Sequence, residues 1–317
     1  MAVGAAVVRG GSISRHRASQ PGPGVAYSES MPSPHGEITH VSDTALMVAA
    51  CRALEAECAD GFVHDPFAGR LAGERGRHIL EALPRPDQMR FGIAVRSHFM
   101  DELLLEALAS QEIATVVSIG CGLDTRPWRL ELPPRLRWIE VDFTDMLDYK
   151  DDLLSGETPR CQRERITADV TSAEQRSAVY AAVGPAPALM ITEGLLMYLP
   201  CAAVESLVAE PWRDSGIAHW MSDITTSVFA KALNMDAMHS IRSVQAPDFL
   251  HGEQILEAAR RNGWVTAARR SYLTDMAFAM ERIRRLMGDR PRPADAPPIP
   301  PDDPTGVHRF ARERKEP

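Results

Sequence analysis

The amino-acid sequence predicts an α/β protein with a doubly wound, mostly parallel, seven-stranded sheet. Three observations lead to this fold class. Short apolar runs alternate with helical segments from Thr115 onward, four of the first five runs end in an acid, and the first run closes on a glycine turn. Strands that alternate with helices form parallel sheets, because each crossover between parallel strands uses a helix that covers the sheet.

The expected strands are short apolar runs bounded by turn residues. They span residues 115–119, 136–141, 165–168, 188–192 and 217–222, with a terminal pair at 264–271 and 307–312. The expected helices between them span residues 145–154, 172–183, 201–210, 227–238 and 252–261, the last stopped by Asn262-Gly263. The prolines between 290 and 304 predict an extended segment.

Further helices are expected before the first strand. One is capped by Ser42 or Asp43 and runs through Leu54, and another is the amphipathic stretch 95–109. Residues 1–36 are rich in Gly, Ser, Pro and Arg and lack periodicity, which predicts a disordered tail. The rest is predicted as one domain over 37–317, with a helical cap over 37–110, a core over 111–317 and a lid insertion near 225–250.

The composition is that of a globular chain. Its 317 residues, 44% of them hydrophobic, suffice for one large core. The net charge of -8 argues against nucleic acid as the main partner, because phosphate binding needs a basic surface. No apolar run reaches the roughly 20 residues that span a bilayer, so no membrane partner is expected. Five scattered cysteines without zinc spacing predict reduced thiols in a cytoplasmic protein and no metal site.

The acids that follow the strands point to a ligand. Asp142, Asp169, Glu193 and Asp223 each follow one strand, and the carboxyl ends of parallel strands share the edge where ligands bind. Asp142 lies 22 residues after Gly120, a spacing at which glycines admit a nucleotide and an acid binds its ribose diol. For Asp223, a role as the N-cap of the next helix stays open.

The glycine turn discriminates between two nucleotide cofactors. A dinucleotide fingerprint has a third glycine at the helix start, where the pyrophosphate sits. In the run Gly120-Cys121-Gly122-Leu123-Asp124-Thr125-Arg126, Thr125 replaces that glycine and Asp124 adds an anion. An anion there repels phosphate but accommodates a sulfonium ligand that carries an amino group. The turn therefore favours S-adenosylmethionine (SAM) over NAD, although Asp124 and Arg126 also have the spacing to pair with each other.

Several stretches resemble the leucine carboxyl methyltransferase-like family, and especially its bacterial members that O-methylate polyketides and other small metabolites. They run in the family's order from about residue 40 to 200, and the match becomes loose beyond residue 225. The matching stretches are Val41-Ser42-Asp43-Thr44-Ala45, Asp65-Pro66-Phe67-Ala68, Arg96 with Asp101, Gly120–Arg126, Glu140-Val141-Asp142, Tyr149-Lys150, Asp169 and Glu193-Gly194-Leu195-Leu196-Met197-Tyr198-Leu199.

The resemblance implies a class I methyltransferase fold whose extra N-terminal helices cap the active site. It also implies cofactor contacts: Arg96 with the SAM carboxylate, Gly120 and Gly122 with the methionine part, Asp142 with the ribose hydroxyls, Asp169 and Val170 with the adenine, and Glu193 near the amino group. Asp124 and Phe143 are further expected cofactor contacts. Simpler alternatives stay open, namely a solvated Arg96, a helix cap at Asp169 and a helix-start acid at Glu193.

Methyl transfer from a sulfonium needs alignment of donor and acceptor and no covalent enzyme intermediate. A base is required only for a hydroxyl acceptor, because a carboxylate is already ionised near neutral pH. His98 and His219 are candidate bases that no spacing singles out. The side chains expected to line the acceptor pocket, or else to pack as core, are Met197, Tyr198, Met235 and Met238.

The sequence therefore predicts a SAM-dependent O-methyltransferase that acts on a carboxylate or hydroxyl of a small, polyketide-like metabolite. The alternatives are a protein C-terminal carboxyl methyltransferase, an NAD-type oxidoreductase and a non-catalytic SAM-binding protein. No feature of the sequence predicts an oligomeric state.

Overall fold

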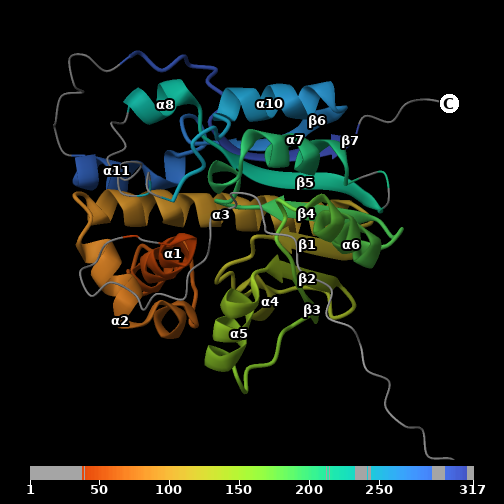
Figure 1. Cartoon of the computed structure of the whole chain (residues 1–317). Coiled ribbons are helices and arrows are strands. Elements are labelled where there is room, and N and C mark those ends of the chain that lie inside the picture. The colour runs from red at the N-terminus through yellow and green to blue at the C-terminus, as the bar shows by residue number, and fades with distance from the viewer. Residues whose placement is uncertain are drawn as a thin grey trace, which may run out of the picture. The chain divides into compact units, whose positions relative to one another are not determined.

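The computed structural model describes residues 38, 40–211, 213, 215–232, 241, 244–287 and 297–312. Its centre is a seven-stranded sheet of order β3-β2-β1-β4-β5-β7-β6 (Figure 1). The strands are β1 (Thr115–Ile119), β2 (Arg137–Asp142), β3 (Gln162–Thr167), β4 (Ala188–Thr192), β5 (Ile217–Ile224), β6 (Trp264–Ser271) and β7 (Gly306–Arg312). Only β7 runs antiparallel to its neighbours. The predicted fold class is thereby confirmed.

Helices connect the strands and cover the sheet. They are α1 (Val41–Ala56), α2 (Ala68–Glu81), α3 (Pro86–Ser110), α4 (Arg126–Arg129), α5 (Thr144–Leu153), α6 (Ala173–Val183), α7 (Cys201–Ala209), α8 (Ser227–Ala232), α10 (Gly252–Arg261) and α11 (Met280–Met287), with short 3-10 turns η1 (Leu196–Tyr198) and η2 (Ala277–Ala279).

The predicted strands are present, and the predicted helices are present as far as the described residues reach, with some corrected boundaries. Helix α3 begins at Pro86 rather than at residue 95, and α2, α4 and α11 were not predicted. The N-cap of α1 is His40, because Asp43 is the third helical residue and its carboxylate accepts the His40 N–H at 3.2 Å. Strand β3 begins at Gln162 rather than at 165. The sequence pattern did not reveal its first residues, because they lie at the sheet edge and carry no apolar pattern.

The sheet buries a core on each face, because neighbouring residues of a strand point to opposite sides. One face packs against α6, α7 and α10 and receives Val117, Ile139, Met190 and Trp220. The other packs against α3 and receives Val116, Trp138, Leu189 and Met221. Figure 1 shows α3 running along one side of the sheet, away from α6, α7 and α10. Helix α3 contacts the sheet and also the N-terminal helices.

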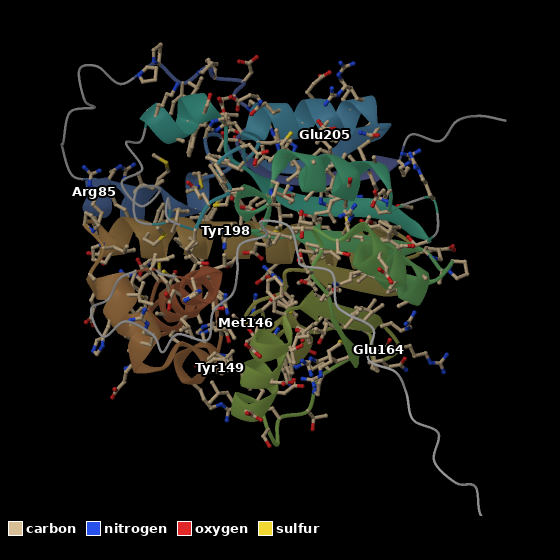
Figure 2. All side chains as sticks on the ribbon, in the orientation of Figure 1. Arg85, Met146, Tyr149, Glu164, Tyr198 and Glu205 are labelled. Atoms are coloured by element: carbon tan, nitrogen blue, oxygen red, sulfur yellow. The ribbon has the colours of Figure 1, made fainter. Side chains whose placement is uncertain are left out.

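A third core joins the N-terminal helices to the segments that follow β1 and β2. Helices α1 and α2 pack on each other and on α3, and their apolar side chains meet Leu123, Trp128 and Met146. The hydroxyl of Tyr149 on α5 donates to the Leu71 carbonyl of α2 at 2.9 Å (Figure 2). The cap formed by α1 and α2 therefore rests against the segment that follows the glycine turn and against α5.

Some predictions fall outside the described residues. These are the tail over 1–36, the end of the helix predicted over 227–238, and the pocket residues Met235 and Met238. The proposed domain boundaries and the lid near 225–250 therefore stay predictions. Within the described part of the chain, no helix is long and apolar enough to cross a membrane.

A buried ion pair ties the C-terminal helix α11 to the cap. Both carboxylate oxygens of Glu55 accept from the Arg282 guanidinium, at 2.6 and 2.5 Å, and the side chains are 0% and 5% exposed. Removing one partner leaves the other charge buried without compensation.

We expect Arg282→Met to lower the free energy of unfolding in urea by about 3 kcal/mol, because it strands the Glu55 carboxylate. The double variant Glu55→Gln/Arg282→Met should recover part of that loss. Arg285→Met is the matched control on the same helix, since Arg285 pairs with Asp60 where both are half-exposed. Equal losses for Arg282→Met and Arg285→Met would contradict the assignment.

Candidate functional site

The strand-end acids meet at one edge of the sheet. Asp142 ends β2, Glu193 follows β4, and Asp223 lies at the end of β5. The sheet order reverses between β1 and β4, which makes this edge the topological switch point of the fold. Asp169 follows β3 and is therefore farther from the switch point. The predicted gathering of acids is present, with Asp169 at its periphery.

The glycine turn after β1 lies beside these acids. Gly120 and Gly122 have φ angles of 62° and 46°, in the left-handed region that favours glycine. A Cβ on Gly120 would lie 2.6 Å from a methyl carbon of Leu195, so glycine also permits close contact with the segment after β4. The turn is thus shaped by backbone conformation and by its neighbour.

Asp142 is held by the backbone of that turn. Its Oδ2 accepts the Gly122 N–H at 2.7 Å, and its Oδ1 accepts the Phe143 N–H at 2.8 Å. Burial raises the pKa of the Asp142 carboxyl above its usual value, and the two amides only partly offset this. Each carboxylate oxygen has a second lone-pair site. Asp142 is therefore fixed in place and retains acceptor capacity.

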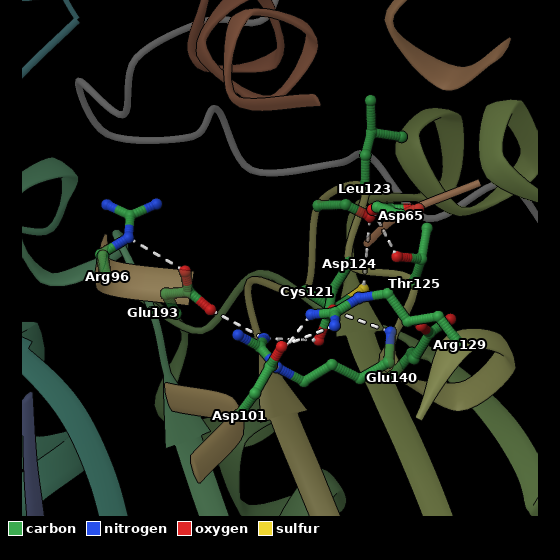
Figure 3. Close-up of polar contacts among 12 residues, drawn as sticks. Asp65, Arg96, Asp101, Cys121, Leu123, Asp124, Thr125, Arg129, Glu140 and Glu193 are labelled. Carbon is green, nitrogen blue, oxygen red and sulfur yellow. Dashed lines mark hydrogen bonds and ion pairs between the residues drawn. The ribbon is translucent and has the colours of Figure 1, made fainter. Parts of the chain in front are cut away.

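Arg126 connects three carboxylates that come from three separate parts of the chain. Its Nε donates to Asp101 at 2.6 Å, and its Nη1 donates to Asp124 at 3.0 Å and to Glu193 at 2.7 Å (Figure 3). Arg129 binds the same Asp101 with two nitrogens, at 2.5 and 2.9 Å. Burial alone lowers the pKa of Arg126, but the three carboxylates raise it well above its usual value. Arg126 therefore stays charged.

Arg96 extends this network on the side of β4 and β5. Its Nε donates to Glu193 at 2.9 Å, and its Nη1 lies 3.5 Å from Asp223. Figure 3 shows the two terminal nitrogens of Arg96 pointing away from Glu193. Arg96 is thus a largely buried cation at the site rather than a solvated helix residue, and its terminal nitrogens point away from Glu193.

Two further ion pairs support the glycine turn. Lys150 is fully buried, and its Nζ donates to Glu140 at 2.8 Å and to the Asp124 carbonyl at 3.3 Å. Arg52 of the cap donates to Asp65 at 2.9 Å and to the Leu123 carbonyl at 2.7 Å. The turn is therefore held from the sheet side and from the cap side.

Cys121 contributes packing to the turn. Its thiol is buried, lies 3.5 Å from Lys150 Nζ, and burial raises its pKa well above the usual value. A thiol with a raised pKa is a poor nucleophile, which favours packing over reactivity. All five cysteines are free.

The remaining predicted residues lie at different distances from this network. Tyr198 in η1 interacts electrostatically with Arg96, and Met197 packs against the cap core. Val170 is buried next to Asp169. Asp169 accepts the Thr171 N–H at 2.9 Å, whereas Ser172 is the N-cap of α6. The side chain of Asp169 is therefore not that helix cap.

The two candidate histidines do not join the acids. His98 and Arg96 are about 200° apart around α3, since a helix turns by about 100° per residue. The His98 ring instead lies near the rings of Phe62 and Phe278, at 6.2 and 4.8 Å. His219 is four residues before Asp223 on β5, roughly 13 Å along the strand from the acid edge. The structure thus brings neither histidine to the strand ends.

Sequence reasoning missed the role of Arg126 and the support from Lys150. The pairing of Asp124 with Arg126 was an open alternative, and it is present. The contacts of Arg126 with Asp101 and Glu193 join residues that are 25 and 67 positions apart. The identity of Arg126, directly after the glycine turn, was the available signal.

Glu193 makes the network sensitive to acid. Burial by itself raises the pKa of Glu193, but Arg126 and Arg96 outweigh it and lower the pKa from 4.5 to about 2. The unfolded chain therefore takes up this proton first as the pH falls. The stabilisation is complete above pH 4.5 and is lost as the pH falls toward 2.

We expect the free energy of unfolding of the wild type to fall by about 2 kcal/mol more than that of Glu193→Gln between pH 4.5 and pH 3. Urea unfolding at a series of pH values measures this difference. Parallel pH dependences of the two proteins would show that Glu193 is not held as an anion by the arginines.

Comparisons with known proteins agree with this geometry. The family model of leucine carboxyl methyltransferase matches residues 45–210, which is more than half of the chain. A protein of Streptomyces avermitilis, provisionally named an S-adenosyl-L-methionine-dependent methyltransferase, is 39% identical over 178 residues, which cover 52% of this chain and 62% of that protein. The chain thus matches less than two thirds of that relative's length.

Two solved structures share the fold at low sequence identity. A provisionally assigned methyltransferase from Thermobifida fusca gives a TM-score of 0.52 at 14% identity and covers 89% of this chain and 97% of that one. A DUF574 family protein from Streptomyces avermitilis gives 0.50 at 15% identity, with 86% and 97% covered. With the family match over residues 45–210, this chain belongs to the leucine carboxyl methyltransferase family.

Proposed function

We propose that this protein is a SAM-dependent O-methyltransferase that acts on a small metabolite, and that its acceptor is a polyketide-like natural product. The observation that carries the proposal is the linked set Arg96–Glu193–Arg126–Asp124, which lies next to Asp142 at the switch point of the sheet. This set offers cations and carboxylates at the place where the fold binds a nucleotide.

The donor set fits SAM group by group. The terminal nitrogens of Arg96 suit the carboxylate of the methionine part, because guanidinium and carboxylate pair in a fork geometry. Glu193 and Asp124 lie close enough to share Arg126. We assign the amino group of SAM to these two carboxylates. Asp142 has acceptor capacity for the ribose hydroxyls. Asp169 and Val170 are proposed to lie near the adenine, and Phe143, next to Asp142, is a further proposed cofactor contact.

The same geometry weighs against NAD. Asp124 stands at the start of α4, where a pyrophosphate would need backbone N–H groups, and its carboxylate accepts the Arg126 N–H at 3.0 Å. Helix α4 spans only Arg126–Arg129. The name of the Streptomyces relative includes S-adenosyl-L-methionine, the cofactor that the glycine turn predicts. We therefore assign SAM as the cofactor.

Bound SAM supplies an activated methyl group and a neutral leaving group. The chain's own residues then have to hold the cofactor, align the acceptor and exclude water. We assign the last role to the cap of α1 and α2, which packs against Leu123 beside the glycine turn. Met197 and Tyr198, next to that cap, are proposed to line the acceptor side.

We expect Asp142→Ala to weaken the binding of S-adenosylhomocysteine at least tenfold in titration calorimetry, because hydrogen bonds to a charged group contribute about 1.5–3 kcal/mol each. Glu164→Gln is the matched control, since Glu164 pairs with Arg137 at the exposed sheet edge, away from Tyr198 (Figure 2). An unchanged affinity of Asp142→Ala, or binding of NAD by the wild type, would refute the cofactor assignment.

A further inference from the structure

One of the two carboxylate oxygens of Asp223 has only a long contact with a hydrogen-bond donor. Its Oδ1 accepts the Gly194 N–H at 2.8 Å. Its Oδ2 faces Nη1 of Arg96 at 3.5 Å, which is long for a charged hydrogen bond. The side chain is only 10% exposed. Because the side chain is partly exposed, a further donor for this oxygen can come from water or from the hydroxyl group of a ligand.

The surroundings of Asp223 contain two phenols. Tyr198 comes from η1 and Tyr272 follows β6, and both interact electrostatically with Asp223 and Arg96. The Tyr272 ring stacks on Phe99 of α3 with centroids 6.0 Å apart. Burial and the Asp223 charge raise the pKa of Tyr272 well above its usual value, so the phenol keeps its proton. Asp223 therefore faces aromatic, uncharged groups on this side.

The charges near Asp223 are unfavourable for an anionic acceptor. Glu193 adds a second carboxylate, and Arg96 is the cation that acts on Asp223. Under the proposed function, Arg96 also receives the SAM carboxylate. A carboxylate acceptor would then meet Asp223 and Glu193 without a cation of its own, and like charges in a buried site repel.

Resting on the proposed function, we propose that Asp223 binds the hydroxyl group of the methyl acceptor and takes up its proton, so that the acceptor is a phenol or alcohol and not a carboxylic acid. Tyr198 and Tyr272 flank this hydroxyl as neutral groups. Neither candidate histidine takes this role, because neither lies at the strand ends.

The step balances without a further reactant. The acceptor O–H bond breaks and its proton passes to Oδ2 of Asp223. A lone pair of the acceptor oxygen forms the new bond to the methyl carbon, while the methyl–sulfur bond breaks and leaves its electron pair on sulfur. Burial raises the pKa of Asp223 above its usual value despite the Arg96 charge, which makes this carboxylate a stronger base near neutral pH.

The test compares acceptors that differ only in the reacting group. 2-Naphthol with 2-naphthoic acid, and 1-decanol with decanoic acid, are incubated with the full chain and SAM, and the methylated products are identified by mass. We expect methylation of the hydroxyl compounds alone. Asp223→Asn should lower kcat at pH 7 at least 100-fold while the affinity for S-adenosylhomocysteine changes less than threefold.

The pH dependence separates a proton acceptor from a structural residue. Among the described residues, the charged and titratable groups that act on Asp223 are Arg96 of α3, Glu193 after β4, Tyr198 of η1 and Tyr272 after β6. With 2-naphthol, the residual rate of Asp223→Asn should rise with pH as the acceptor ionises by itself. Glu164→Gln should keep the wild-type rate and pH profile.

Methylation of the carboxylic acids by the wild type would overturn the inference, and so would an unchanged kcat of Asp223→Asn. A loss of S-adenosylhomocysteine binding in Asp223→Asn would also overturn it, because this result would place Asp223 on the cofactor. Failure of the wild type to bind S-adenosylhomocysteine is a distinct result, because it removes the proposed function as well.

Discussion

The site depends on one buried guanidinium. Arg126 holds Asp101 from α3, Asp124 from the glycine turn and Glu193 from the end of β4. A buried arginine is tolerated only when carboxylates compensate it. Asp101 and Glu193 each have a second arginine, Arg129 and Arg96, so the loss of Arg126 would weigh most on Asp124. Arg126 therefore couples the positions of the turn, the helix and the strand end.

The acids of this edge fall into two groups. Glu193 is bound by two arginines, and its pKa is lowered. Asp142 and Asp223 are held mainly by backbone N–H groups, and burial raises the pKa of both. The first group holds the two arginines in place and, in the proposed function, also faces the amino group of SAM. The second group retains acceptor capacity in a dry environment, which is the arrangement expected of groups that meet a ligand.

Local pattern was enough to predict the sheet and the glycine turn, because strand period, turn glycines and strand-end acids are all short-range signals. It was not enough for Arg126, whose partners Asp101 and Glu193 come from distant segments. Helix α11 was missed, and its anchoring pair, Arg282 with Glu55, joins residues 227 positions apart, which no short-range pattern can reveal. His98 was a candidate through its proximity to Arg96 in the chain, but helix geometry points the two side chains in different directions.

The two halves of the site have different relations to the family. The family match covers residues 45–210, which include the turn, Asp142, Glu193 and the arginines that hold them. Asp223 on β5 and Tyr272 after β6 lie beyond that match. Residues shared within a family fix the shared cofactor, whereas acceptor choice requires contacts that differ among members. The family name refers to a carboxyl acceptor, but this does not determine the acceptor of this chain. The charged groups near Asp223 and Tyr272 decide which acceptor fits.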